Sequence, residues 1–196
     1  MSQIKLKHSG GNGVIIAAPT SNPASDRTIT LPSDADGTLA RTLDVAFKSY
    51  AIIGDKKDGA TAGGSITAGD WRTHDLQTEF SDPDGIVSIS SNQFTLQAGS
   101  YFVTHKSVFF HTNSGVTKLY NVTDGADVSN SFSVPIYARN ASTHAIQVTG
   151  SVRFTISGEK TFELRARSAI DSSIGFGVAS TFADNHYAII DIFKEV

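Results

Sequence analysis

The sequence predicts an all-β protein, an antiparallel jelly-roll β-sandwich preceded by an extended N-terminal arm. Two long segments, 146–156 and 161–170, alternate apolar with polar residues, which is typical of half-buried strands. Turn signals rich in glycine and aspartate separate further strand-like segments at short intervals. Roughly eight or nine such strands describe a sandwich of two antiparallel sheets.

The chain divides near residue 50 into an arm and a folded domain. Breaker residues recur every few positions at the start of the chain, so no helix can run through that part. We expect residues 1–50 to form the docking arm, in which residues 43–50 have the apolar spacing of a short helix. Residues 51–64 are expected to be a linker or loop, and residues 65–196 the jelly-roll domain, to which the resemblance given below adds trimerisation.

Short apolar segments interrupt the turns of the arm. Such segments are too short to build a core and would be stable only against another surface. Because disordered segments seldom carry recurrent aliphatic residues, a docking arm is favoured over the alternative of a disordered tail. The candidate docking residues are Ile4, Leu6, Val14, Ile15, Ile16, Ile29 and Leu31.

The two alternating segments are joined by the tight connection Ser157-Gly158-Glu159. A connection this short predicts that they form one antiparallel hairpin. The other strands are expected at 86–89, 93–96, 100–112, 116–122, 131–137 and 187–193, with one more around 71–76.

The last strand, 187–193, is apolar on both faces and is broken only by Asp191. In an antiparallel sandwich one face of each sheet is normally exposed to solvent, so we expect the second apolar face of this strand to be buried against other chains. Segment 100–112 is also apolar on both faces. The alternative is a strand that crosses between sheets or is covered by the arm of its own chain. The candidate subunit-contact residues are Tyr101, Val103, Phe109, Tyr187, Ile189 and Phe193, whereas Ala188, Ile190 and Ile192 are assigned to the core.

Composition excludes several classes of function. Charged residues make up 18% of the chain, the net charge is −3, and the longest basic run is Lys56-Lys57. We therefore expect no nucleic-acid partner and no membrane insertion. The chain has no cysteine, which excludes disulfides and thiolate metal sites. The first residues lack the apolar segment of a signal peptide, so export by that route is not expected.

No catalytic residue, metal site or cofactor is predicted. A Gly-x-Ser-x-Gly elbow is missing, and Thr73-His74-Asp75 lies in a predicted strand whose neighbouring side chains point to opposite faces. His105 could be a metal ligand on a three-fold axis, but a hydrogen-bonded strand histidine is the favoured alternative. Three aspartate-rich segments lack the remaining carboxylates of a calcium loop and are interpreted as turns: 34–37, 82–85 and 124–127.

One motif connects the folded domain to a known family. Residues 94–101, Phe-Thr-Leu-Gln-Ala-Gly-Ser-Tyr, join a strand, a glycine turn and an aromatic restart of the sheet. With residues 71–76, 86–93 and 118–124, this motif resembles the trimeric jelly roll of complement globular heads and tumour-necrosis-factor-like domains, in the version found in bacteriophage structural proteins. The stretch 171–185 departs from the family pattern, so specificity carried by loops is not transferred.

The arm shows a second resemblance. Residues 4–13, 18–26 and 30–32 are similar to a segment that recurs in structural proteins of marine phages, cyanophages especially. Together the two resemblances cover most of the chain. They imply a non-enzymatic homotrimer on the exterior of the virion, made in the host cytoplasm.

Two functions follow from these resemblances. In the first, the protein is a capsid decoration or cement protein whose arm docks on the major capsid protein or another virion component. In the second, it is a short tail or head fibre that binds a host glycan or receptor. The first is favoured because the chain has no fibre shaft. The loops expected to carry recognition in the second are 82–85, 121–130 and 171–185.

Overall fold

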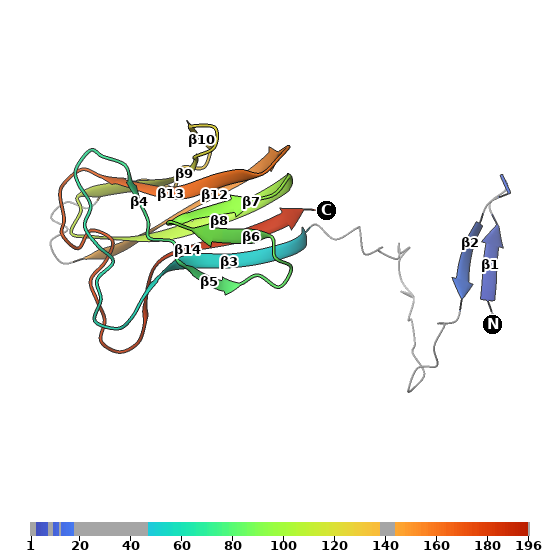
Figure 1. The fold of residues 1–196 in the computed structure, drawn as a ribbon, viewed down its shortest axis with the longest axis horizontal. Coiled ribbons are helices and arrows are strands. Elements are labelled where there is room, and N and C mark those ends of the chain that lie inside the picture. The colour runs from blue at the N-terminus through green and yellow to red at the C-terminus, as the bar shows by residue number, and fades with distance from the viewer. Residues whose placement is uncertain (1–2, 8–9, 12, 18–46, 138–143, 196) are drawn as a thin grey trace. The chain divides into compact units, whose positions relative to one another are not determined.

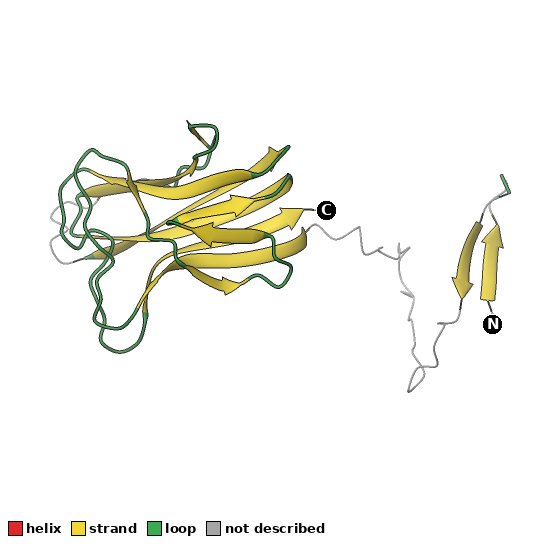
Figure 2. Ribbon diagram, viewed as in Figure 1, coloured by secondary structure: helices red, strands yellow, loops and turns green. Residues whose placement is uncertain are grey.

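The computed structural model describes residues 3–7, 10–11, 13–17, 47–137 and 144–195. These residues form β-strands and loops without any helix, as Figure 2 shows, so the predicted all-β class is confirmed. It follows that no described segment is an apolar helix long enough to cross a membrane. The chain separates into two units, Met1–Leu39 and Ala40–Val196.

The first unit contains an antiparallel hairpin of β1 (Gln3–Lys7) and β2 (Gly13–Ala17), drawn in blue in Figure 1. Gly11 in the turn has a φ of +101°, a conformation that glycine adopts without steric cost. The register sets Ile4 opposite Ile16 and Leu6 opposite Val14. Ile15 also lies in β2, whereas the predicted docking residues Ile29 and Leu31 lie outside the described residues.

The second unit is a sandwich of two antiparallel sheets (Figure 1). The five-stranded sheet has the order β12-β8-β14-β3-β5. Its strands are β3 (Phe47–Lys57), β5 (Thr78–Ser81), β8 (Gly99–Phe110), β12 (Ala145–Ile156) and β14 (Asn185–Glu195).

The second sheet has the order β10-β9-β13-β7-β6, with β11 paired to β9 and β4 paired to β13. Its strands are β4 (Arg72–Thr73), β6 (Val87–Ser90), β7 (Gln93–Leu96), β9 (Ser114–Asn121), β10 (Ala126–Asp127), β11 (Ile136–Tyr137) and β13 (Lys160–Ser168). All of these pairings are antiparallel.

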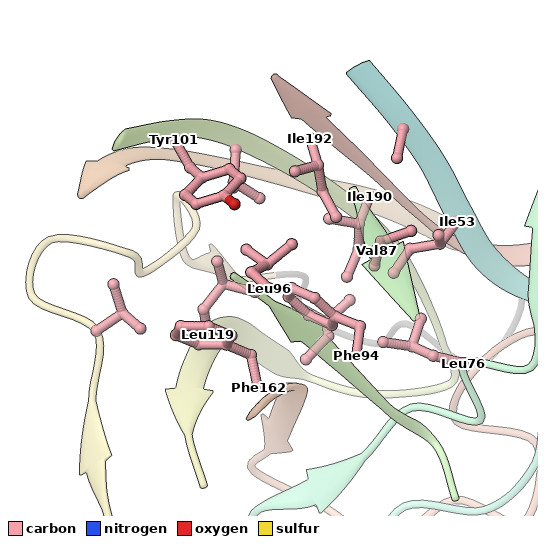
Figure 3. Packing of buried hydrophobic residues seen from close by; sticks show 14 of the residues in the cluster. Ile53, Leu76, Val87, Phe94, Leu96, Tyr101, Leu119, Phe162, Ile190 and Ile192 are labelled. Atoms are coloured by element: carbon pink, nitrogen blue, oxygen red, sulfur yellow. The ribbon is translucent and has the colours of Figure 1, made fainter. Parts of the chain in front are cut away.

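The hydrophobic core lies between the inner faces of the two sheets (Figure 3). Phe94 of β7 stacks on Phe162 of β13 with ring centroids 5.5 Å apart. Tyr101 of β8 points into the same cluster, and its hydroxyl donates a hydrogen bond to the Gln97 carbonyl at 2.8 Å. Full burial of each large apolar side chain stabilises the fold by about 1.5–3 kcal/mol. In the absence of disulfides this packing is the main source of stability.

The connection at residues 157–159 carries the chain from one sheet to the other. β12 pairs with β8, whereas β13 pairs with β9, β7 and β4, so the predicted hairpin of 146–156 with 161–170 is wrong. The alternation itself is confirmed, because Val152 and Phe162 are both buried. A tight connection can join two strands side by side or two strands stacked across a core. Here both apolar rows meet in the core, so the strands belong to different sheets.

Strand β3 begins before the predicted start of the folded domain. Phe47–Tyr50 and residues 51–57 both belong to it, so the expected helix is wrong over 47–50 and the expected linker is wrong over 51–57. The start of the helix prediction, residues 43–46, lies outside the described residues. The physical reason is pairing: β14 has an open edge that β3 fills, with Ile53 opposite Ile190. Residues 58–64 form a loop as expected.

Candidate functional site

Four of the six predicted subunit-contact residues fill the core of the chain itself. Tyr101 and Val103 are 0% exposed, Phe109 is 1% exposed and Tyr187 is 4% exposed, so they have no surface left to offer a partner. Both rows of β8 are apolar, and a period of two does not tell which row faces the second sheet. The predicted face of β8 is therefore corrected: Phe102 and its row point outward, while Tyr101 and its row point inward.

A β-bulge explains the position of Tyr187. The register of β14 against β3 shifts between His186 and Ala188, so Tyr187 is the extra residue of the bulge, and Tyr187 and Ala188 are both buried. The Tyr187 hydroxyl donates a hydrogen bond to the Thr61 carbonyl at 2.6 Å. Gly177, whose φ is +120°, leaves room for the Tyr187 ring, because a Cβ at this position would lie only 2.6 Å from the ring. Beyond the bulge the predicted core row of Ala188, Ile190 and Ile192 is confirmed.

The outer face of the five-stranded sheet carries a continuous aromatic surface. Tyr50, Phe193 and Phe102 are direct cross-strand neighbours on β3, β14 and β8. The Phe47 ring lies 5.1 Å from the Phe193 ring and 6.2 Å from the Phe102 ring. Phe47 is 43% exposed and Tyr50 is 42% exposed. Contiguous exposed apolar surface marks sites of interaction. We call Phe47, Tyr50, Phe102, Ile189 and Phe193 the aromatic face.

Asp191 lies within this surface and is paired inside its own chain. It accepts hydrogen bonds from the Thr104 hydroxyl at 2.9 Å and from the Lys106 ammonium at 3.3 Å, both on the neighbouring β8. Its carboxylate is largely buried, with 20% of the side chain exposed. Because the charge already has partners, a surface that covers the aromatic face does not have to supply a cation.

A serine, a histidine and an aspartate meet in the interior of the protein. The Ser107 hydroxyl lies 2.7 Å from Nε2 of His74, and Oδ2 of Asp55 lies 3.7 Å from Nδ1 of the same ring. These are the residue types of a hydrolytic triad. The three side chains are at most 1% exposed, so no substrate can reach them. The cluster therefore ties together β3, β8 and the segment after β4, and Lys57 anchors it at 3.2 Å from Asp55.

His105 is also a structural residue. Its Nε2–H donates to the Ser131 carbonyl at 2.8 Å, and the Thr117 hydroxyl lies 3.3 Å from Nδ1. A Cβ at Gly150 would lie 2.5 Å from the ring, so glycine makes room for it. The hydrogen-bonded interpretation is thus confirmed. In the part of the chain that the structure describes, no three histidine or carboxylate side chains form a metal-binding group.

Comparison with solved structures identifies the fold. Eiger TNF from S. frugiperda is similar, with a TM-score of 0.51 at 9% identity over 78% of this chain and 94% of that chain. The globular domain of zebrafish complement 1qA gives a TM-score of 0.46 at 14% identity over 74% and 95% of the two chains. Vertex protein P5 of PRD1 gives 0.45 at 15% identity over 78% and 100%.

The fold is thus the antiparallel jelly roll of TNF-like domains, as predicted. At these identities the likeness shows the fold alone. No model of a known protein family matches the sequence, and no curated protein does.

The two buried histidines predict a loss of stability in mild acid. Burial disfavours the imidazolium and lowers the pKa of His74 and of His105 below the usual value, although Asp55 and the Ser131 carbonyl act in the opposite direction. As the pH falls below about 6.5, the unfolded chain takes up protons that the folded chain does not. The free energy of unfolding is expected to fall by up to about 1.4 kcal/mol per pH unit for each histidine.

Denaturant unfolding at several pH values between neutral and mildly acidic measures this slope. His105→Gln should flatten it, whereas the control His111→Asn should not, because His111 is exposed and asparagine suits its φ of 56°. An unchanged slope in His105→Gln would show that His105 does not titrate as argued.

Proposed function

We propose that this chain is a non-enzymatic bacteriophage virion structural protein that assembles as a homotrimer and decorates the exterior of the capsid. The observation that carries the assembly is the aromatic face, because Phe47 and Tyr50 remain more than two-fifths exposed beside Phe102 and Phe193. Three copies packed around an axis would cover this surface, and the internal pairing of Asp191 removes the main electrostatic cost.

The revised contact set differs from the first prediction. Ile189 and Phe193 are retained, and Phe47, Tyr50 and Phe102 replace the residues that fill the core. The virion location is supported by the sequence resemblance of the arm and of residues 94–101. The docking role of the arm is supported by its hairpin, since an isolated pair of strands is at best marginally stable in water and gains from a surface to bind.

The fibre function is a second candidate that one observation favours. In the loop at residues 171–184, Val178 is 52% exposed and Phe182 is 97% exposed. Exposed apolar side chains of this kind are typical of residues that contact a binding partner. The same loop sends Phe176 inward, where its ring lies 4.1 Å from the His74 ring. The loop is therefore anchored at one residue and exposed at another, as a recognition loop would be.

Charge placed on the aromatic face is expected to dissociate the trimer. Tyr50→Glu and Phe193→Glu should each convert a three-chain particle into single chains, because a carboxylate would be buried without a partner at the contact. Light scattering coupled to size exclusion measures the mass, and circular dichroism checks that the sandwich remains folded. Phe182→Glu adds the same charge at a 97% exposed site and should leave the mass unchanged. A single-chain mass for the unmodified protein would refute the trimer.

Removal of residues 1–39 is expected to abolish binding to the particle while leaving a folded trimer. This deletion takes away the whole first unit and leaves β3 intact. Co-sedimentation with particles that lack the protein measures binding, and the full-length chain is the positive control. If the shortened chain binds as well as the full-length chain, the arm is not the docking element.

Electron cryomicroscopy of the source particle separates the two candidate functions. Decoration predicts trimers repeated over the shell lattice, with the arm lying across capsid subunits. The fibre function predicts a few copies at the tail or at one vertex. Density confined to the tail would reject decoration, and density over the whole shell would reject the fibre.

A further inference from the structure

An open depression of about 330 Å³ lies in the second sheet, where β9, β11 and β13 come together. It is formed by the first residues of β9, the last residues of β13 and the segment that leads into β11. Small residues such as Gly69 and Ser114 line it, together with Ile136 and Arg167. Because no bulky side chain fills it, there is room for a ligand the size of one sugar ring.

Among the described residues of this face, Arg167 is the cation that lacks an acidic partner. Its neighbours on the same face are neutralised: Lys118 pairs with Asp127, and Nε of Arg165 lies 2.7 Å from Glu163. Among the described residues no carboxylate lies within ion-pair distance of Arg167, which is exposed. A planar guanidinium with free donors is suited to bidentate recognition of a carboxylate.

Aromatic side chains stand next to this arginine. The pairing of β4 with β13 sets Arg72 opposite Ala166, which brings Trp71 alongside Arg167, with 6.0 Å between the guanidinium carbon and the ring centre. Phe132 meets the Trp71 ring edge-on at 6.2 Å and is itself 48% exposed. An aromatic surface beside a cation fits a ligand with one apolar face and one anionic group.

We propose that this depression binds a saccharide unit that carries a carboxylate, such as a sialic or a uronic acid. The Arg167 guanidinium would hold the carboxylate, and the Ser114 hydroxyl would meet the ring hydroxyls. The apolar lining residues Val116, Pro135 and Ile136 would meet the C–H face of the ring. Trp71 lies next to Arg167 at the margin of the depression, with the Lys118 ammonium 4.0 Å from its ring centre. The acidic net charge of the chain, −3, argues against a polyanion as the ligand. A compact anion with an apolar face matches a depression that holds one cation and several apolar residues.

The single tryptophan of the chain makes the test direct, because all indole fluorescence reports on Trp71. The full-length protein is titrated at constant ionic strength with N-acetylneuraminic acid, glucuronic acid, glucose and sodium sulfate. We expect a saturable change in fluorescence with at least one of the acids and none with glucose. Arg167→Gln and Arg167→Lys should weaken binding about tenfold or more, because the bidentate charge-assisted contact is lost.

Lys160→Gln is the matched control, since Lys160 begins the same strand and pairs with Asp124 away from the depression. This variant should bind like the unmodified chain. Equal affinity of Arg167→Gln, equal binding of glucose, sulfate binding as strong as that of the sugars, or no saturable change with either acid would each overturn the proposal. The depression is in the second sheet, whereas the aromatic face is on the five-stranded sheet. A negative binding result would therefore not contradict the proposed trimer, and a single-chain mass would not prevent the test of this binding site.

Discussion

Strand β14 carries apolar side chains on both faces, and much of the sandwich is arranged around it. It lies between β8 and β3 in the five-stranded sheet, and one of its rows closes the core against the second sheet. Its other row, with Ile189 and Phe193, joins Phe102 and Tyr50 on the outer side. Both rows gain free energy only when water is excluded from them. The second sheet does this for the inner row, and in the proposed trimer a second copy of the chain would do it for the outer row.

Neutral hydrogen bonds hold the two sheets in one relative position. His105 of β8 reaches Thr117 of β9 and the Ser131 carbonyl, and the Ser107 hydroxyl of β8 reaches His74. A buried polar group that loses its partner costs about 1–3 kcal/mol, so these contacts select this stacking of the sheets over others. His74 and His105 therefore act as internal connectors. His74, which stands between Thr73 and Asp75 in the sequence, is used for packing in the interior.

The two outer faces of the sandwich differ in chemistry. The five-stranded sheet shows aromatic rings with its central charges paired internally, which suits a broad apolar contact. The second sheet shows cations beside aromatic rings, and one of those cations, Arg167, keeps its donors available. The proposed self-association and the proposed ligand recognition would thus occupy separate surfaces of one small domain without competing for the same residues.

The sequence by itself determined the all-β class and the inward rows of β12 and β13, because a period of two places alternate side chains on one face whatever the partner strand is. Strand partners depend on backbone contacts between distant segments, so only the tertiary structure separated β12 from β13 and recruited β3. Where both rows of a strand are apolar, as on β8, the alternation does not predict which row faces the core. Only the packing against the second sheet shows that Tyr101 and its row are the buried ones. The bulge at Tyr187 and the meeting of Trp71 with Arg167 likewise arise from strand register, which local residue patterns do not encode.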